Sequence, residues 1–179
     1  STVPNANLKP VEISEWEVGT NLLFINNRLG LDFSVYQKKT KDDIVQVTTS
    51  SASGYGSSIQ NVGEIRNTGI ELLVYGVPVK TTDFIWNTSI NLAHNSSEVL
   101  YLGEGVSSFN IDGAVSRSGN ATITNIVGNP YGQIIGYKYK TDDAGNRIFD
   151  SNGLPIRDSQ ISVLGDGVYK LTGGFRNDF

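Results

Sequence analysis

Two carboxylates, Glu15 and Glu17, form the pair whose spacing comes nearest to known acid–base chemistry. In an extended strand, residues two apart share a face and lie ~6.7 Å apart. The carboxyl groups of an inverting glycosidase are ~6.5–9.5 Å apart. A general acid also needs surroundings that raise its pKa, and the neighbouring sequence offers none. We therefore interpret the pair as polar positions on a water-facing strand and expect no enzyme; a glycosidase, which would lose hydrolysis on Glu→Gln substitution, is the alternative.

The other residue types that carry chemistry are few. His94 is the only histidine, and the chain contains no cysteine, which excludes thiol catalysis, disulfides and Cys/His metal sites. Residues 142–146 and 150–153 resemble calcium loops, but Ala144 occupies the third EF-hand position and Gly145 comes two residues early. We interpret both segments as turns and place His94 in a loop or at a strand end. The sequence predicts no catalytic residue, no metal site and no cofactor.

Three tyrosines, Tyr131, Tyr137 and Tyr139, are the candidates for a binding surface. Aromatic rings combine a large apolar body with a polar tip and anchor partners at interfaces. In a long loop, the three rings could contact a substrate or a partner protein. The alternative is that they pack within a local hairpin.

The composition narrows the class of protein. Of 179 residues, 38% are hydrophobic and 18% are charged, and the formal net charge is −4. A nucleic-acid-binding surface needs clustered basic residues, so we expect no nucleic-acid partner. No apolar run approaches the ~18 residues of a transmembrane helix, and residues 1–10 lack the pattern of a signal peptide. A β-barrel gives little hydropathy signal, because its strands are ~9–11 residues of alternating character.

Alternation of apolar and polar residues predicts two β-hairpins within residues 1–95. We expect the strands at about 14–24, 29–40, 68–78 and 84–95. The polar residues 26–28 join the first pair and residues 80–83 join the second, and both segments are typical of tight turns.

Each expected strand has one apolar and one polar face. The apolar face would contain Trp16, Val18, Leu22, Leu31, Phe33, Ile70, Leu72, Trp86, Ile90 and Leu92. The polar face would contain Glu15, Glu17, Asn21, Asp32, Glu71, Asn87 and Asn91. A barrel wall turns its apolar face to lipid and its polar face to water, whereas a soluble sheet packs the apolar face on a core.

Residues 96–168 lack sustained alternation and are expected to form one long loop. A small hairpin within it is predicted from a strand at 131–140, a turn at 142–146 and a short return strand at 147–150. Alternation resumes over 169–179, which we interpret as the start of a further strand.

Strand length and turn length favour a membrane barrel over a soluble sheet. The strands are roughly 10–12 residues long, whereas globular strands are usually ~5–6. Short turns alternate with a long link at 40–68, and aromatic residues such as Trp16 and Phe84 lie near strand ends, as in outer-membrane barrels. The fold class is therefore all-β, a segment of a transmembrane barrel. A soluble β-sandwich that binds carbohydrate or acts as an adhesin is the alternative.

Seven sequence blocks occur in the order found in one known family. The blocks are W-E-V-G-T-N-L at 16–22, N-N-R-L-G-L-D-F at 26–33, T-K-D-D-I at 40–44, N-V-G-E-I-R-N-T-G-I-E-L at 61–72, G-N-P-Y-G-Q-I-I-G-Y-K-Y at 128–139, D-S-N-G-L-P-I at 150–156 and L-T-G-G-F-R-N-D-F at 171–179. With them the chain resembles the C-terminal half of SusC/RagA-type TonB-dependent outer-membrane transporters of Bacteroidetes. It departs from the family at 166–170, where an N-P-x-W type sequence is more usual.

The resemblance implies about five antiparallel strands of a plugged barrel of ~22 strands in the bacterial outer membrane, with residues 96–168 as a long extracellular loop. Such transporters import glycans or oligopeptides and pair with a SusD-like surface lipoprotein. They receive energy through TonB, which contacts a part of the protein absent from this chain. The wall would contact membrane lipid. Because the family pattern continues past Phe179, we interpret the chain as a piece of a longer protein.

Overall fold

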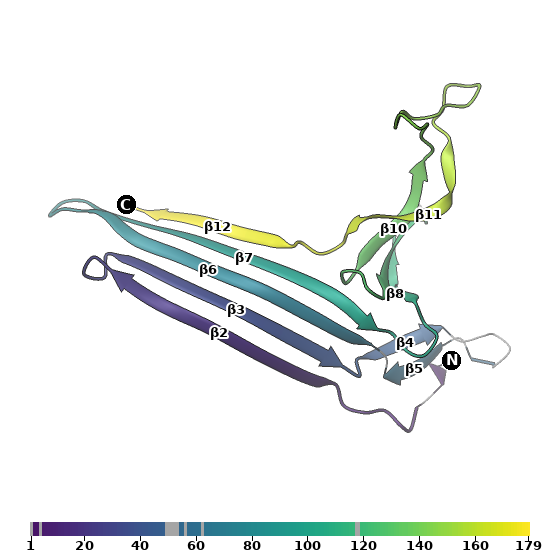
Figure 1. The fold of residues 1–179 in the computed structure, drawn as a ribbon, viewed down its shortest axis with the longest axis horizontal. Helices are drawn as coiled ribbons and strands as arrows, with labels where there is room; N and C mark the ends of the chain where they lie inside the picture. The colour runs from purple at the N-terminus through teal and green to yellow at the C-terminus, as the bar shows by residue number, and fades with distance from the viewer. Residues whose placement is uncertain (1, 4, 49–53, 56, 62, 117–118) are drawn as a thin grey trace.

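The computed structural model of this chain describes residues 2–3, 5–48, 54–55, 57–61, 63–116 and 119–179. All the secondary-structure elements in these residues are β-strands, and the strands form three sheets. Within the described residues, no helix is long and apolar enough to cross a membrane. Figure 1 shows five long strands side by side, with the two smaller sheets gathered at one end.

The largest sheet is antiparallel, and each of its strands pairs with the next strand of this same sheet along the chain. Its strands are β2 (Glu12–Phe24), β3 (Leu29–Lys41), β6 (Glu64–Lys80), β7 (Ile85–Tyr101) and β12 (Leu171–Asp178). The two hairpins expected from alternation are therefore present, and β6 and β7 are longer than the predicted ranges. The added residues at the loop end mix charged side chains such as Arg66 and Glu98 with apolar ones such as Ile65 and Val99, so hydrophobic alternation did not continue into them.

Two short turns close one end of this sheet, which we call the turn end. In the first, Ile25, Asn26 and Asn27 all have positive φ, and the Arg28 N–H donates to the Ile25 carbonyl. Asparagine tolerates this backbone region, whereas a β-branched residue rarely adopts it. In the second turn, the Thr81 N–H donates to the Phe84 carbonyl. We call the opposite end, where the smaller sheets lie, the loop end.

The connection between β3 and β6 supplies two strands of a small three-stranded sheet at the loop end, and residues 2–3 supply the third. In this sheet, β5 (Ser57–Asn61) pairs antiparallel with β4 (Ile44–Thr48) and parallel with β1 (Thr2–Val3). The sequence predicted only a long link at 40–68, because β4 and β5 have five residues each and β1 has two, which is too short for sustained alternation. Residues 49–53, 56 and 62 of that link lie outside the described residues.

The segment predicted as a long loop with one small hairpin instead contains a four-stranded sheet. Its strands are β8 (Ser108–Val115), β9 (Ala121–Ile126), β10 (Gln133–Tyr139) and β11 (Arg157–Asp166). The return strand that pairs with β10 is β11, not residues 147–150, where only isolated bridges form. The prediction differed because two consecutive turns separate β10 from its partner, whereas a hairpin was expected to close after the first turn.

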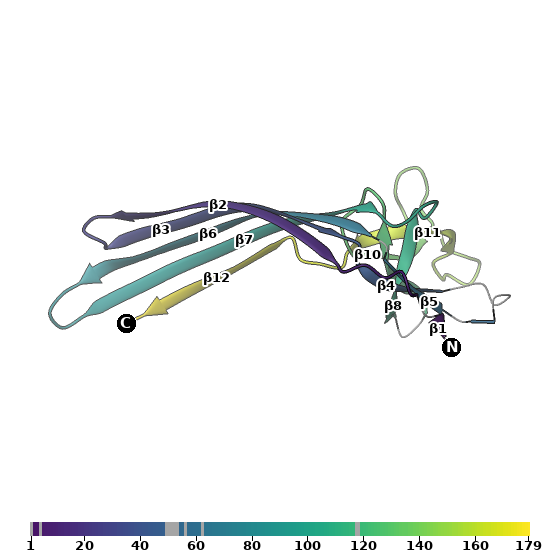
Figure 2. The same cartoon turned by 90° about the horizontal axis from the view of Figure 1, so that it is seen from below.

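The long sheet has almost no core of its own. Val99 and Leu102 are the only buried hydrophobic side chains among the described residues. The chain exposes 12365 Å², whereas a compact monomer of this size exposes roughly 8,500 Å². Figure 2 shows the five long strands as a single twisted layer. A β-sandwich needs a second sheet across the apolar face, so the sandwich alternative is wrong for this fold.

Candidate functional site

The pairing register separates the five-stranded wall into two chemically different faces. Because Val18 pairs with Val35, Val35 with Ile70 and Ile70 with His94, these residues share one face of the sheet. All ten residues expected on the apolar face lie on it, and all seven expected polar residues lie on the other. We use the terms apolar face and polar face for these two surfaces.

An aromatic cluster marks the apolar face at the turn end. The Phe179 ring stacks on Phe84 and on Trp86, with centroids 6.2 and 6.1 Å apart. The Trp86 Nε1–H donates to Asn177 Oδ1 at 2.9 Å. Aromatic rings with a polar tip are typical of the boundary between membrane and water.

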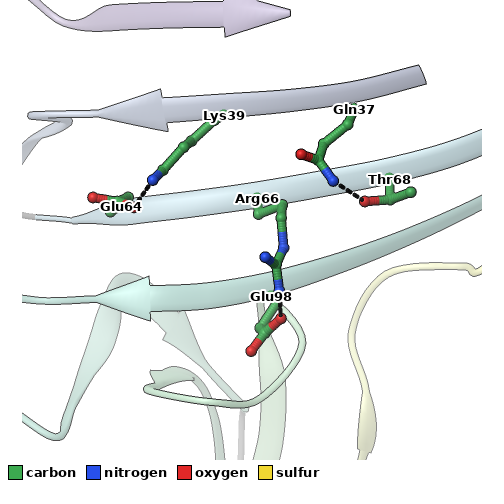
Figure 3. Close-up of polar contacts among 6 residues, drawn as sticks. All are labelled: Gln37, Lys39, Glu64, Arg66, Thr68 and Glu98. Atoms are coloured by element: carbon green, nitrogen blue, oxygen red, sulfur yellow. Dashed lines mark hydrogen bonds and ion pairs between the residues drawn. The ribbon is translucent and has the colours of Figure 1, made fainter. Parts of the chain in front are cut away.

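Charged residues replace the apolar ones toward the loop end of the same face. Lys39 pairs with Glu64 and Arg66 with Glu98, and Gln37 donates to Thr68 one row closer to the apolar residues (Figure 3). We call Lys39, Glu64, Arg66 and Glu98 the charged belt. Charges of this kind are costly in hydrocarbon, so the belt lies beyond the end of the apolar band.

The apolar band between these boundaries has the height of a bilayer core. On β7, ten residue steps separate Trp86 from Ser96, which lies in the row of Gln37 and Thr68. At ~3.3 Å per residue and a strand tilt of ~40°, this corresponds to a height of about 25 Å. Trp16 pairs with Gln37 and therefore adds an aromatic ring at the boundary of the band nearer the loop end.

The polar face carries an open depression of about 510 Å³ near the loop end. Its lining includes the carboxylates of Glu15, Glu17 and Glu71 and the ammonium of Lys38. Lys38 pairs with Glu15 across β2 and β3, so one cation faces three anions. The surface can receive polar or cationic groups, and it contains no nucleophile placed beside a base.

Glycines opposite tyrosines keep this polar face shallow. Tyr36 pairs with Gly69, and Tyr75 pairs with Gly30. A Cβ atom at either glycine would overlap the ring of the tyrosine opposite. The glycines therefore let each ring lie against the neighbouring strand instead of standing out into the space beside the wall.

The structure places both candidates for acid–base chemistry, the Glu15/Glu17 pair and His94, within strands of the wall. Glu15 and Glu17 lie on the polar face, as expected for water-facing positions. His94 was expected in a loop or at a strand end, and this is wrong. It lies within β7 between Ile70 and Leu171, because β7 continues to Tyr101. Within the described part of the chain, no three His, Asp or Glu residues are arranged to hold a metal ion.

A small buried junction attaches the four-stranded sheet to the end of β7. The backbone of Val99 bonds to Asn129 and Gly128, and the Tyr131 N–H donates to Ser97 Oγ. Asn125, only 3% exposed, accepts the Gly132 N–H through its side chain. The junction was not predicted from the sequence, because its polar residues lie in a segment without regular alternation.

A second connection returns the chain from β11 to the wall. The Asp166 carboxylate pairs with Lys170 at 2.5 Å and accepts a hydrogen bond from Gln133. Lys170 and then Gln133 lower the pKa of Asp166 from its usual value. The Lys170 carbonyl accepts the Asn95 N–H. The residues at 166–170 that depart from the family pattern thus form an ordered link into β12.

Only two of the three candidate tyrosines lie on one face. Tyr137 and Tyr139 are two residues apart in β10 and so point to the same side of the strand. Tyr131 lies before β10, at the junction. The Arg157 guanidinium lies 4.3 Å from the Tyr137 ring centroid, and Arg147 lies 5.4 Å from that of Tyr139. Such cation–π contacts orient the rings. The two arginines were not among the predicted site residues.

The segments at 142–146 and 150–153 are turns, as the sequence predicted. Asp142 accepts hydrogen bonds from the Asn146 N–H, the Asn146 side-chain amide and the Ala144 N–H, and these bonds lower its pKa, that of the Asn146 N–H most. Asp150 accepts the Asn152 and Leu154 N–H groups in the same way. Each carboxylate is therefore used within its own turn.

A strand wall with an apolar band of bilayer height on one face and polar residues on the other is the wall of a membrane β-barrel. Residues 1–178 match the family model for the TonB dependent receptor-like β-barrel. The chain therefore belongs to this family, which places it in the bacterial outer membrane. The family is a class of receptors and transporters and not a class of enzymes.

The relatives agree with this family. TonB-dependent receptor P3 of Formosa agariphila is 30% identical over 97% of this chain, and TonB-dependent receptor SusC of Bacteroides thetaiotaomicron is 26% identical over 91%. The RagAB peptide transporter structure superposes with a TM-score of 0.72 at 23% identity over 92% of this chain. The chain spans 19%, 16% and 19% of these proteins, respectively, and so under a fifth of each.

Proposed function

We propose that this chain is part of the wall and the extracellular surface of a TonB-dependent transporter that imports glycans or oligopeptides. The observation that supports this most directly is the apolar band of about 25 Å with a polar face behind it. The wall acts by forming a water-filled passage and by recognition, and it performs no covalent chemistry. Its polar face, with Glu15, Glu17 and Glu71, lines the interior of the barrel.

The loop end of the wall is assigned to the cell exterior. Outer-membrane barrels have short periplasmic turns and long extracellular loops. Here the turns at 25–28 and 81–84 are short, whereas the connections at the other end contain whole sheets. Residues 96–168, apart from the end of β7, then form the extracellular structure predicted from the sequence.

The proposed partners follow from the relatives. SusC-type and RagAB-type transporters support pairing with a SusD-like surface lipoprotein, and membership of the TonB-dependent family supports energy supply through TonB. The TonB contact would be made by a part of the protein outside this chain. RagAB is a peptide transporter, and this supports oligopeptides as one of the two proposed substrate classes.

Tyr131, Tyr137 and Tyr139 are proposed to contribute to the contact with substrate or lipoprotein. Tyr139 is half exposed and carries Arg147 beside its ring, which gives an aromatic and a cationic group on one surface. Tyr137 supports that surface from the same face of β10. Tyr131 is held at the junction through its backbone and would fix the base of the surface.

Gene deletion in the source bacterium tests the proposed transport. The deletion strain, supplied with single oligopeptides or glycans as sole nutrient, should lose growth on one of these two classes and regain it with the full-length gene. Inactivation of TonB should give the same loss. Unchanged growth on every nutrient that the parent strain uses would contradict the proposal.

Complementation with tyrosine variants tests the contact surface. Tyr139→Ala should reduce uptake at limiting nutrient, whereas Tyr101→Ala should not. Tyr101 is a matched control because it is equally exposed, at 50%, but pairs with Glu64 in a row of the apolar face. Equal uptake by both variants would remove the tyrosines from the proposed site without affecting the proposed transport.

A further inference from the structure

An open groove of about 380 Å³ indents the apolar face near the turn end. It crosses the three central strands and is lined mainly by apolar atoms. Its lining includes Leu29 of β3, Val74 and Gly76 of β6, and Thr88 and Ile90 of β7. A groove of this size is within the range of pockets that bind small ligands.

The groove exists because small residues meet at a break in the strand register. Gly76 pairs with Thr88, and the register shifts between Gly76 and Val79. Larger side chains, Val74 and Ile90, form the next row toward the loop end. On β6 and β7 this row holds only a glycine and a threonine, with Leu29 of β3 beside them, so a hollow remains in the apolar face.

One cation, Arg28, lies at the rim of the groove at the turn end. Its Nε–H and Nη2–H groups donate to the Val77 carbonyl at 3.2 and 2.9 Å, and Nη2 also donates to the Pro78 carbonyl at 3.1 Å. These bonds hold the guanidinium beside the bulge. Its Nη1 group has no partner among the described residues, and Arg28 forms none of the ion pairs found there.

The turn at 25–28 places the apolar side chain of Ile25 at the groove, and this requires an unfavourable backbone conformation. Ile25 lines the groove and has φ 55°, a region that β-branched residues disfavour. An asparagine or a glycine would adopt this conformation more readily, but neither would supply apolar surface. Strained residues of this kind cluster at binding and functional sites.

Adjoining barrel strands would leave the groove open. The sheet order is β12-β7-β6-β3-β2, so strands that pair with β2 or β12 extend the wall at its edges and not across its middle. The groove lies on the apolar face, at the level where that face ends near the aromatic cluster of Trp86. Toward the loop end the groove would therefore be surrounded by hydrocarbon, and at Arg28 it would meet the lipid headgroup layer.

We propose that this groove binds one phospholipid of the periplasmic leaflet, with an acyl chain along Leu29, Val74 and Ile90 and the phosphate at Arg28. Guanidinium matches the charge and the geometry of phosphate oxygens, and the Nη1 donors are free to bind them. The apolar lining fits a hydrocarbon chain and would not bind a free anion. The bound lipid would cover the bulge at Val77 and Pro78.

Native mass spectrometry of the full-length, delipidated transporter tests this proposal. Dioleoylphosphatidylglycerol is titrated into the wild type and into Arg28→Gln, which keeps donors for the two carbonyls but loses the charge. We expect about a fivefold weaker binding for Arg28→Gln, corresponding to ~1 kcal/mol for one exposed contact between opposite charges. Arg28→Lys, which keeps the charge, should recover part of the binding.

Lys80→Gln is the matched control, because Lys80 is an exposed cation at the same end of β6. It should bind lipid as the wild type does. Val74→Phe, which fills the groove and leaves Arg28 in place, should also weaken binding, so the test remains valid if an Arg28 variant fails to fold. Equal loss in Arg28→Gln and Lys80→Gln, dioleoylglycerol binding as tightly as the phospholipid, or competition by inorganic phosphate would each overturn the proposal.

Discussion

The five-stranded wall and the junction with the four-stranded sheet bury their side chains by different means. Every residue of β2 is exposed, and apolar residues such as Val18 and Ile70 are about half exposed or more. At the junction, Val99, Leu102 and Asn125 are almost completely buried by the chain itself. The chain itself therefore leaves the apolar face of the wall uncovered, whereas the junction forms a small core within the chain.

This difference separates two kinds of mutational effect. Substitutions at the junction should disturb the four-stranded sheet and leave the five-stranded wall intact. Substitutions on the wall should act through the environment of each face, so that neighbouring residues on one strand respond oppositely. The following experiments test these two expectations.

The largest effect is expected at the junction. Leu102 is 2% exposed, and Leu102→Ala should cost about 2–5 kcal/mol of local stability through lost burial and a residual cavity. Limited proteolysis of the full-length protein should then cut faster within residues 108–166 while the barrel stays folded. Val106→Ala is the control, because Val106 is 41% exposed nearby. Equal cleavage of both variants would show that the junction does not hold the sheet.

On the wall, charge should be tolerated on one face only. Leu72 pairs with Leu92 near the middle of the apolar band, so Leu72→Arg should cost ~2–4 kcal/mol and impair assembly, as should Ile90→Arg. Asn91→Arg, on the polar face of the same strand as Ile90, should assemble normally. The heat-dependent shift of the folded barrel on gels measures this. Equal assembly of all three variants would contradict the assignment of faces.

A smaller effect is expected where a tyrosine lies over a glycine. Gly69→Ala should cost about 1–3 kcal/mol by overpacking, because the new Cβ overlaps the Tyr36 ring. Gly165→Ala, whose Cβ would meet no atom within 4 Å, should be neutral. Denaturant unfolding of the barrel measures both. Addition of Tyr36→Ser should remove most of the Gly69→Ala penalty, and a strictly additive double variant would refute the contact.

The smallest effect is a pH dependence at the link into β12. Lys170 and Gln133 lower the pKa of Asp166 in the folded protein, so its stabilising contribution is present above the usual pKa of aspartate and lost as pH falls through the lowered value. The protection factor of the Gly167 amide, which corrects exchange for its intrinsic slowing in acid, should therefore fall, so that exchange becomes fast relative to that of an unprotected amide. Asp166→Asn should show the fast exchange already at neutral pH, whereas Asp143→Asn should behave as the wild type.

The wall was predictable because its signal is local. Alternation at Trp16, Val18 and Leu22 repeats every two residues, and this period is fixed by strand geometry. The turn at 26–28 was also predictable from the sequence, since Asn26 and Asn27 tolerate positive φ. The same argument failed at the ends of β6 and β7, where Arg66 and Glu98 pair across strands but add no hydrophobic period.

The four-stranded sheet was not predictable in this way. The pairing of β10 with β11 joins residues separated by two turns, and the burial of Asn125 depends on a hydrogen bond to Gly132. Such contacts leave no repeat in the sequence. The groove on the apolar face depends on the register shift near Gly76 and on the carbonyls that Arg28 reaches.

The sequence by itself determined the all-β class, the two hairpins, the division of each strand into apolar and polar faces, and the family. These properties follow from side-chain periodicity and turn chemistry, which act over a few residues. The tertiary structure decided the length of the apolar band, the four-stranded sheet, the place of His94 within β7 and the groove beside Arg28. Each of these depends on which residues of distant strands lie opposite one another, and this register is set only when the whole sheet forms.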